Sequence, residues 1–334
     1  MTPVMDATSR RTAPLVTVVI TVYKRAEFLR EAIDSVLAQT FQDFEFILVE
    51  DGSHVAERIA QEYGGRLRYI WQEHQGVSKA RNAGAAMGST PWIAWLDDDD
   101  LWLPEKLERQ LSAAKAAPDV ALLHTDHLFR EIDGSERPGP RLTPSEQVPS
   151  GWVSRALFLN NFIITSSTLV RREAFEAVGG FDVSLRLVED YDLWMRISRR
   201  FPVMFVPERL TIYRVHGANM TRQGDLRDAL ASVQALHGML AKDPGLEAAV
   251  GRDAVARRFH RSYAYSGFTH YYRGHYATAR KHMLAAWRWK PSDVRLLVYA
   301  ALCTMGSRGR GVARAMWRRR PGDGPTPSAE QGGA

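Results

Sequence analysis

The sequence predicts an α/β protein with a doubly wound, mostly parallel sheet and a C-terminal helical appendage, and three observations support this fold class. Apolar runs of strand length alternate with helical repeats in the first part of the chain. Polar and acidic side chains follow the ends of several of these runs. From Asp225 onward the repeats are all helical. Alternating strands and helices are typical of a parallel sheet whose two faces are covered by helices.

The expected strands are apolar runs over residues 15–22, 44–49, 67–71, 92–96 and 120–124. Segments with apolar residues at helical spacing lie between them, over residues 27–38, 55–63, 77–87 and 104–116. A stretch rich in Gly, Pro and charge over residues 133–151 predicts a loop, followed by a strand over 162–170 and a helix that begins near Val188. Later helices are expected over residues 229–240, 254–272, 276–289 and 294–305.

We expect the chain to divide into a flexible N-terminus (1–14), one α/β domain (15–224), a basic helical region (225–320) and a disordered tail (321–334). With 334 residues, 45% of them hydrophobic, it can bury a large core. The only cysteine, Cys303, fits a reducing compartment, and the first residues lack the apolar core of a signal peptide. The apolar stretch over 296–305 is about half of the roughly 20 residues that span a bilayer, so we expect a cytoplasmic protein.

Positive charge is concentrated late in the chain. Residues 251–320 hold 16 Lys and Arg against two acids, within a net charge of +6 for the whole chain. Trp287, Trp289 and Trp317 lie among these cations. We expect this segment to make peripheral contact with an anionic membrane, on the inner face of the plasma membrane; a solvated helical surface is the alternative. A nucleic-acid partner is not expected, because no recognised nucleic-acid module is visible.

Four consecutive aspartates, Asp97 to Asp100, are the most informative feature of the sequence, because apolar and aromatic residues flank them on both sides. They fall where a buried strand ends and a helix with Pro104 at its start follows. The repulsion between carboxylates in such a place is relieved either by protonation of some of them or by a cation bound among them. The alternative without a ligand is an acidic turn that caps the helix.

Two neighbouring strand ends offer groups that suit a nucleoside. The first expected strand ends with Thr21 and Tyr23, and the second ends with Glu50 and Asp51. A base can stack on Tyr23 while Asp51 accepts a hydrogen bond from a ring N–H. Taken alone, the sequence from Asp51 to Ser53 also fits a simple turn.

The helix expected after Gly76 places Ser78 and Arg81 near its first turns. A helix N-terminus with an arginine favours anions, and the anion suggested here is the diphosphate of a nucleotide. Two alternatives stay open: Arg81 orients Asp51 or the base, or the segment is an ordinary surface helix.

Taken in order, these motifs resemble the family 2 glycosyltransferases, which have the GT-A fold. The resemblance covers about residues 15–220 and rests on segments 18–23, 35–41, 49–53, 76–84 and 96–100. It implies an inverting enzyme that moves a sugar from a nucleoside-diphosphate sugar, with a UDP-sugar favoured over a dTDP-sugar. The acceptor it implies is a glycan or a lipid-linked glycan, in cell-surface polysaccharide synthesis.

The resemblance also implies roles for the residues at the strand ends. Tyr23 and Asp51 match the residues that hold the nucleoside base, and Thr21 borders the same pocket. Ser78 and Arg81 are expected to bind the nucleotide-sugar as well. The family often has two aspartates before Gly-Ser, whereas this chain has Glu50 before Asp51.

The aspartate run matches the family's DxD motif, which implies Mg²⁺ or Mn²⁺ as cofactor. A hard divalent cation prefers oxygen ligands and bridges the two phosphates of the donor. By position, Asp99 is the candidate for direct contact with the metal, and Asp97 or Asp98 faces the ribose, with Asp97 a second metal candidate. The segment ending in His216 resembles the family's late Tyr-Arg-x-His, so His216 contacts the metal or the diphosphate, or is structural.

A catalytic base is implied by residues 179–194, which match the family's glycine-rich acceptor loop and the acidic pair that follows it. By position Asp190 is the base that takes the proton of the acceptor hydroxyl, and Glu189 is its neighbour. The alternative is that both acids only complement a helix dipole.

The sequence argues against two other enzyme classes. A nicotinamide enzyme needs Gly-x-Gly-x-x-Gly after the first strand, but residues 21–27 contain no glycine. A sugar nucleotidyltransferase needs a Gly-rich basic loop at the same place to hold a triphosphate, and this loop is missing. A catalytically inactive sugar-nucleotide or glycan-binding module of the same fold is the remaining alternative. The sugar, the acceptor and the linkage depend on loops over residues 160–168 and 181–188, whose shapes no motif determines.

Overall fold

The structure is a computed structural model that describes residues 13–139, 148–217, 219 and 226–317. The chain forms two compact units, Met1–Met220 with Asp243–Gly251, and Thr221–Lys242 with Arg252–Ala334. The flexible N-terminus expected over residues 1–14 lies almost entirely outside the described residues, and the tail expected over 321–334 lies entirely outside them.

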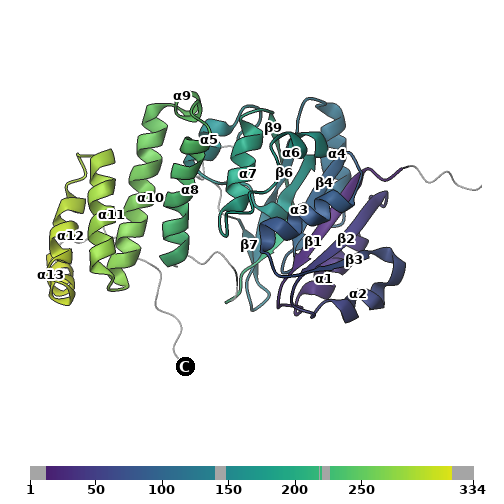
Figure 1. The fold of residues 1–334 in the computed structure, drawn as a ribbon, viewed down its shortest axis with the longest axis horizontal. Helices are drawn as coiled ribbons and strands as arrows, with labels where there is room; N and C mark the ends of the chain where they lie inside the picture. The colour runs from purple at the N-terminus through teal and green to yellow at the C-terminus, as the bar shows by residue number, and fades with distance from the viewer. Residues whose placement is uncertain (1–12, 140–147, 218, 220–225, 318–334) are drawn as a thin grey trace, which may run out of the picture. The chain divides into compact units, whose positions relative to one another are not determined.

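The first unit is built on one sheet (Figure 1). Its nine described strands follow the order β3-β2-β1-β4-β8-β6-β9-β5, with β7 beside β6. The strands are β1 (Val16–Val22), β2 (Phe44–Asp51), β3 (Arg68–Gln72), β4 (Trp92–Asp97), β5 (Leu101–Trp102), β6 (Leu122–Arg130), β7 (Glu136–Pro138), β8 (Thr168–Arg171) and β9 (Val203–Arg214). The first four pair in parallel, as their alternation with helices predicts.

The helices of this unit follow the predicted helical repeats, with further short helices later in the chain. They are α1 (Leu29–Leu37), α2 (Glu57–Tyr63), α3 (Val77–Met87), α4 (Lys106–Ala116), α5 (Ser154–Leu159), α6 (Arg172–Ala177), α7 (Glu189–Ser198) and α9 (Leu246–Val250). α3 packs very closely on the sheet, since a Cβ atom added at Gly84 would lie 2.4 Å from Cγ1 of Val19. Only glycine allows this approach, which brings the first turns of α3 to the strand ends.

The central strands are apolar throughout because both of their faces are covered. In β1, Val16 to Ile20 are buried without interruption, and β4 is buried from Trp92 to Leu96. Such continuous burial is typical of parallel strands that lie between helices. The polar ends of these strands, beginning with Thr21 and Asp97, are therefore the first positions at which a ligand can meet side chains.

The second half of the sheet is mixed rather than parallel. β8 runs antiparallel to both β4 and β6, and β5 runs antiparallel to β9, while β6 and β9 are parallel. β7 lies inside the segment that was expected to be a loop, where it forms a hairpin with β6. Of the nine described strands, β1 to β4, β6 and β9 run in one direction, so the prediction of a mostly parallel sheet is confirmed. The strand-helix alternation did not predict the three strands that run against them, β5, β7 and β8.

The strand predicted over residues 162–170 is wrong in its first part. Only Thr168–Arg171 joins the sheet, and Thr165–Ser167 forms a 3₁₀ turn. The hydroxyl groups explain the difference: Ser167 Oγ donates to the carbonyl of Ile164 at 2.8 Å, and Thr168 Oγ1 donates to the carbonyl of Thr165 at 2.8 Å. Such local bonds compete with the ladder of a strand.

Residues 243–251 were expected in the helical region, but they belong to the first unit. Asp243 accepts a hydrogen bond from Arg199 Nε at 2.8 Å, and the carbonyl of Val250 accepts one from Arg155. α9 packs against α5. Sequence patterns could not predict that the chain returns to the first unit here, because this return depends on contacts between distant segments.

The second unit consists of helices: α8 (Leu226–Lys242), α10 (Arg252–Tyr272), α11 (Tyr276–Trp289), α12 (Arg295–Cys303) and α13 (Ser307–Trp317). Tyr271, Met283 and Tyr299 lie in its core, where the helices α10 to α12 meet. α13 was not predicted because Gly309 and Gly311 interrupt its pattern. A Cβ at Gly309 would lie 2.1 Å from the carbonyl oxygen of Leu302, so glycine is required there. Over the described residues, no helix has both the length and the apolar character to cross a membrane.

Candidate functional site

The candidate site lies at the ends of three neighbouring strands, β2, β1 and β4. Thr21 at the end of β1 is in register with Val49 on one side and with Asp97 on the other. Tyr23 and Asp51 follow at the same edge of the sheet. The structure thus brings together the side chains that the sequence analysis assigned to a nucleoside and to a metal.

Asp51 is 3% exposed and accepts four hydrogen bonds. Gln72 Nε2 and the backbone N–H of Gln75 donate to Oδ1 at 2.7 and 2.9 Å. His74 Nδ1 and the backbone N–H of Gly76 donate to Oδ2, both at 2.8 Å. Although burial alone would raise the pKa of Asp51, these hydrogen bonds lower it below its ordinary value. The carboxylate therefore stays ionised and caps the N-terminus of α3.

Tyr23 is stacked against His74. Their ring centroids are 3.9 Å apart and the planes differ by 10°. The ammonium of Lys24 lies 4.8 Å from the centroid of the Tyr23 ring. Tyr23 is accordingly placed as an aromatic platform beside Asp51, with an imidazole already on it.

Glu50, which stands where the family often has the first of two aspartates, has a structural role. It is fully buried, and its carboxylate accepts hydrogen bonds from the hydroxyls of Ser53 at 2.8 Å and Tyr69 at 2.7 Å. The backbone N–H of Ala56 also donates to it, at 3.1 Å. Burial would raise the pKa of Glu50, but these donors hold it below its ordinary value. Glu50 thus fixes the loop before α2, and Asp51 alone faces the site.

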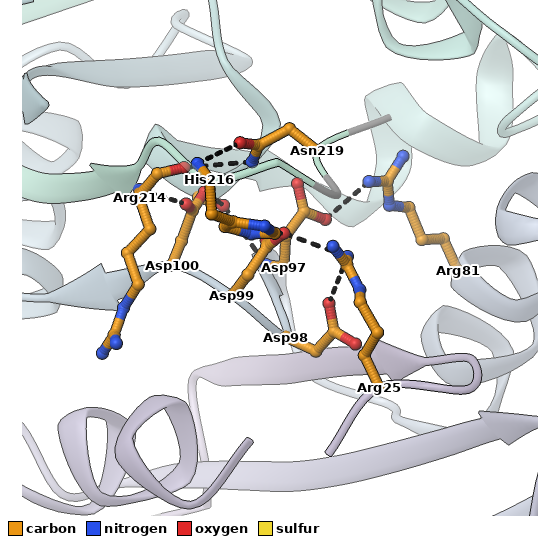
Figure 2. Close-up of polar contacts among 10 residues, drawn as sticks. Arg25, Arg81, Asp97, Asp98, Asp99, Asp100, Arg214, His216 and Asn219 are labelled. Atoms are coloured by element: carbon orange, nitrogen blue, oxygen red, sulfur yellow. Dashed lines mark hydrogen bonds and ion pairs between the residues drawn. The ribbon is translucent and has the colours of Figure 1, made fainter. Parts of the chain in front are cut away.

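Arg81 links the two acidic parts of the site, and Figure 2 shows its contact with Asp97. Its Nη2 lies 2.6 Å from Oδ1 of Asp97, and its Nη1 lies 2.7 Å from Oε1 of Glu189. The arginine is 5% exposed, and the charges of the two carboxylates raise its pKa in spite of its burial. Arg81 therefore holds the end of β4 against the start of α7.

Arg25 and His216 both contact the middle of the aspartate run. Arg25 Nη2 lies 3.2 Å from Oδ1 of Asp98 and 3.0 Å from Oδ2 of Asp99 (Figure 2). His216 Nε2 lies 3.0 Å from the same Asp99 oxygen. Burial, with the charge of Asp99 as a further cause, raises the pKa of Asp98 to about 8. The repulsion within the run is thus relieved in two ways, by the raised pKa of Asp98 and by the positive charge of Arg25.

Asp100 is the structural member of the run. It is 1% exposed and accepts hydrogen bonds from Ser166 Oγ at 2.5 Å and from the backbone N–H of Arg214 at 3.1 Å. Burial and then the charge of Asp99 raise its pKa well above the ordinary value. Ser166 also accepts from the backbone N–H of Asp97 at 3.2 Å. Asp100 therefore anchors the run to the turn before β8 and to the end of β9.

Asp190 lies at the start of α7, partly exposed, and its Oδ1 accepts from the backbone N–H of Tyr191 at 2.6 Å. Burial, followed by the charge of Glu189, raises its pKa to about 7. Val188, directly before this pair, has a φ of 60°. A β-branched residue in the left-handed region is strained, and such strain is typical of functional sites. Glu189 and Asp190 thus directly follow a residue with a strained backbone conformation.

The loop before α7 is attached to α3. Asn82 Nδ2 donates to the carbonyl of Phe181 at 2.8 Å, and the backbone N–H of Phe181 donates to Asn82 Oδ1 at 2.9 Å. Ser78 Oγ donates to the carbonyl of Leu185 at 3.3 Å. Gly180 has a φ of 69°, and a Cβ there would lie 2.8 Å from Asn82 Oδ1. Ser78, which was expected to face the nucleotide, is therefore directed to this loop.

Several acidic side chains of the site lie close enough together to raise the question of a metal ion. Within the described part of the chain, no group of three or more His, Cys, Asp and Glu side chains is arranged to hold a metal ion. Asp99 and His216 nevertheless converge at 3.0 Å, and the side chain of Asp97 is 30% exposed beside them. Mg²⁺ is usually held by one or two carboxylates together with substrate phosphates and waters. The residues present fit such a partial coordination shell.

Three residues of the site escaped the sequence analysis. Arg25 lies three residues after the end of β1, and its position there was the signal that could have indicated a role. His74 and Ser166 reach the site through contacts between distant segments, so the sequence offers no comparable signal for them.

Residues 17–179 match the family model for glycosyl transferase family 2. The chain is 34% identical over 212 residues to an uncharacterized glycosyltransferase of Rickettsia prowazekii, over 63% of this chain and 66% of that protein. It is 30% identical over 210 residues to an uncharacterized glycosyltransferase of Methanocaldococcus jannaschii, over 60% of this chain and 71% of that protein. The chain spans 66% of the first relative's length, and 34% of that of another from Rickettsia felis.

Two solved structures have a similar fold. Staphylococcus aureus TarS 1–349 in complex with UDP-GlcNAc has a TM-score of 0.66 at 16% identity, over 91% of each chain. The mannosyltransferase PcManGT from Pyrobaculum calidifontis, in complex with GDP-Man and Mn²⁺, has a TM-score of 0.55 at 17% identity, over 92% of this chain and 89% of that one. From its family model, its relatives and its fold, the chain belongs to glycosyltransferase family 2 and has the GT-A fold.

Proposed function

We propose that this glycosyltransferase moves a sugar, with inversion, from a nucleoside-diphosphate sugar to a hydroxyl of a glycan or lipid-linked acceptor. A UDP-sugar is favoured, a dTDP-sugar is the alternative, and cell-surface polysaccharide synthesis is the proposed setting. The observation that supports this most is the link through Arg81, which joins Asp97 to Glu189, the neighbour of Asp190. The proposed metal ligand Asp97 and the neighbour of the proposed base thus share one arginine.

Asp190 is proposed as the general base. Its pKa of about 7, raised by burial and by Glu189, lies close to the pH at which a base is most effective. Arg81 holds Glu189 in position beside Asp190. In the reaction, the acceptor oxygen bonds to the anomeric carbon while its proton passes to Asp190. The bond from that carbon to the diphosphate oxygen breaks, and its electron pair leaves with the nucleoside diphosphate. A single displacement of this kind inverts the configuration.

Tyr23 and Asp51 are proposed to hold the base, with Thr21 beside them at the end of β1. Arg81 and Ser78 were expected to bind the nucleotide directly, but Arg81 contacts two carboxylates and Ser78 contacts Leu185. We therefore assign both to positioning: Arg81 fixes the acids, and Ser78 fixes the loop before α7. TarS, which shares the fold, has been solved with UDP-GlcNAc, and this supports a nucleotide-sugar donor.

A divalent cation, Mg²⁺ or Mn²⁺, is the proposed cofactor, held by Asp99 with Asp97 and His216. When bound, it would neutralise charge on the departing diphosphate. Asp98 completes the acidic face toward the ribose, and Arg25 contributes a positive charge beside Asp99. The Mn²⁺ in PcManGT supports this choice of cofactor.

A donor screen tests the proposal. The purified chain is incubated with UDP-, dTDP- and GDP-sugars and Mn²⁺, with and without EDTA, and nucleoside diphosphate release is followed by mass spectrometry. We expect release from one donor class, lost in EDTA. The alternative function, a catalytically inactive sugar-nucleotide or glycan-binding module, predicts binding without release from any donor.

The second unit supports a separate proposal about location, a peripheral contact with the anionic inner face of the plasma membrane. One side of α12 and its flanks exposes Val294, Leu297, Val298 and Met305, in a region rich in arginine. Apolar side chains beside cations suit an anionic lipid surface. Flotation with phosphatidylserine vesicles at low salt is the test: binding that weakens with salt is expected, and no binding would contradict it.

A further inference from the structure

His74 makes two contacts at the site at once. Its ring lies 3.9 Å from the ring of Tyr23, nearly parallel to it, and its Nδ1 lies 2.8 Å from Oδ2 of Asp51. Because the ionised carboxylate only accepts hydrogen bonds, Nδ1 is the protonated nitrogen of this pair. The sequence analysis gave His74 no role.

These are the contacts that the proposed function assigns to the base of the donor. A pyrimidine would stack on Tyr23 and donate a ring N–H to Asp51. The imidazole is a planar heteroaromatic ring with a ring N–H, and it stacks on the same tyrosine and donates to the same carboxylate. In this structure His74 therefore lies where its own contacts compete with those of a base.

Asp51 cannot accept a base without losing a donor. A carboxylate offers about four lone-pair sites, and Asp51 accepts four hydrogen bonds. Two of the donors are the backbone N–H groups of Gln75 and Gly76, which directly precede α3. A third is the amide of Gln72 on β3. His74 is the fourth, and its side chain is 49% exposed.

The backbone of His74 is held in place, so the side chain is the part that can move. A Cβ added at Gly52 would lie 2.6 Å from the backbone nitrogen of His74, which shows how closely the two segments pack. Rotation of the half-exposed imidazole toward solvent breaks the contacts of Nδ1 with Oδ2 and with the backbone carbonyl of Asp51, and the stacking on Tyr23. It requires no movement of the loop.

We propose that the His74 side chain is an internal substitute for the nucleobase, which must rotate away before the donor base can stack on Tyr23 and bond to Asp51. The inference rests on the proposed function. His74 then sets donor affinity, because the measured affinity is reduced by the fraction of molecules in which the imidazole occupies the base position. It also acts as a selectivity filter, since only a base that replaces both contacts displaces it fully.

Calorimetric titration with UDP and Mn²⁺ tests this inference on the full chain and on His74→Ala. Removal of the competing ring should tighten UDP binding by roughly fivefold to tenfold, the size of one net hydrogen bond with a stacking contact. Inorganic pyrophosphate with Mn²⁺, which has no base, should bind both proteins equally. Weaker or unchanged UDP binding by His74→Ala would overturn the inference, because it would mean that His74 supports the base or lies outside its path.

His54 offers a matched control. It is a second histidine near the same strand ends, stacked on Trp71 with ring centroids 4.8 Å apart. Its φ is 56°, a conformation that asparagine tolerates, so His54→Asn removes a stacked imidazole without added strain. UDP affinity should not change in this variant, and a gain as large as that of His74→Ala would overturn the assignment to His74.

An NMR measurement on the wild-type chain tests the inference without any substitution. With ¹⁵N-labelled histidine, the His74 ring signals should move to solvent-like positions on addition of UDP and Mn²⁺, and stay in place with pyrophosphate and Mn²⁺. Ring signals unmoved by saturating UDP would overturn the inference while leaving the glycosyltransferase proposal intact. If no nucleoside diphosphate binds to either protein, the proposed function fails, and this inference fails with it.

Discussion

Arg81 Nη1 lies 2.7 Å from Oε1 of Glu189, and its Nη2 lies 2.6 Å from Oδ1 of Asp97. Arg81 thus joins the helix that carries the candidate base to the strand end that carries one candidate metal ligand. The two elements are far apart in sequence, and their relative position determines whether a proton acceptor can face the sugar while the diphosphate is held. Arg81 thus connects the two ends of the proposed reaction.

Replacement of Arg81 by lysine tests this connection. Lysine keeps one positive charge but cannot contact both carboxylates with a planar fork, so Asp97 and Glu189 should lose their mutual alignment. We expect kcat/KM to fall about 100-fold, because small displacements of reacting groups have effects of this size. The same change at Arg109, an exposed residue of α4, should leave the rate unaltered. Equal rates in both variants would remove Arg81 from the mechanism.

The pH dependence of the reaction follows from Asp190. The base must be deprotonated to accept a proton, and its pKa is raised to about 7. We therefore expect kcat/KM to be low at acidic pH and to rise to a plateau above about pH 7. Because the charge of Glu189 contributes to the raised pKa, Glu189→Gln should move the acidic limb to lower pH. A pH-rate profile of both proteins measures this, and an unchanged limb would argue against Asp190 as the titrating group.

The metal requirement follows from Asp99. Removal of divalent cations by EDTA should abolish sugar transfer, and Mn²⁺ or Mg²⁺ should restore it. Asp99→Asn should raise the Mn²⁺ concentration needed for half-maximal activity by about tenfold or more, since one carboxylate ligand is lost. Asp133→Asn, in an exposed turn, is the control. Full activity of the wild-type chain after exhaustive chelation would contradict the metal assignment.

Ser166 should matter for stability. Its hydroxyl donates to the buried Asp100, and Ser166→Ala removes this donor without adding another. We expect the free energy of unfolding to fall by about 1–3 kcal/mol, the cost of a buried polar group left with fewer partners. In the exposed loop, Ser135 donates to Asp133 at 2.6 Å, and Ser135→Ala should change stability by less than about 0.5 kcal/mol. Urea unfolding curves of Ser166→Ala, Ser135→Ala and the wild-type chain measure these changes in the free energy of unfolding.

Much of the first half of the fold could be predicted from sequence because its signals are local. The strands β1 to β4 are apolar runs and α3 ends where its pattern ends, so periodicity identified them. The turn at Thr165–Ser167 could not be predicted this way, since its hydroxyl groups bond to nearby carbonyls in place of a strand ladder. α13 was missed because its glycines, required by close packing, weaken the helical pattern.

The site shows the same division. Strand ends converge in a parallel sheet by geometry, so the meeting of Tyr23, Asp51 and Asp97 followed from the element order. The hydrogen-bond and ion-pair partners of these residues did not follow from the element order. His74 on Asp51, and Arg25 on Asp99, depend on side-chain directions that one sequence does not reveal.

The most direct test of the account is the turnover of Asp190→Asn with the donor found by the screen. Asparagine keeps the shape of the side chain but accepts no proton, so UDP affinity should persist while kcat falls by about 10²- to 10⁴-fold. Glu176→Gln, an exposed charge loss on α6, should keep wild-type kcat. If Asp190→Asn turns over as fast as the wild-type chain, Asp190 is not the base and the proposed mechanism is wrong.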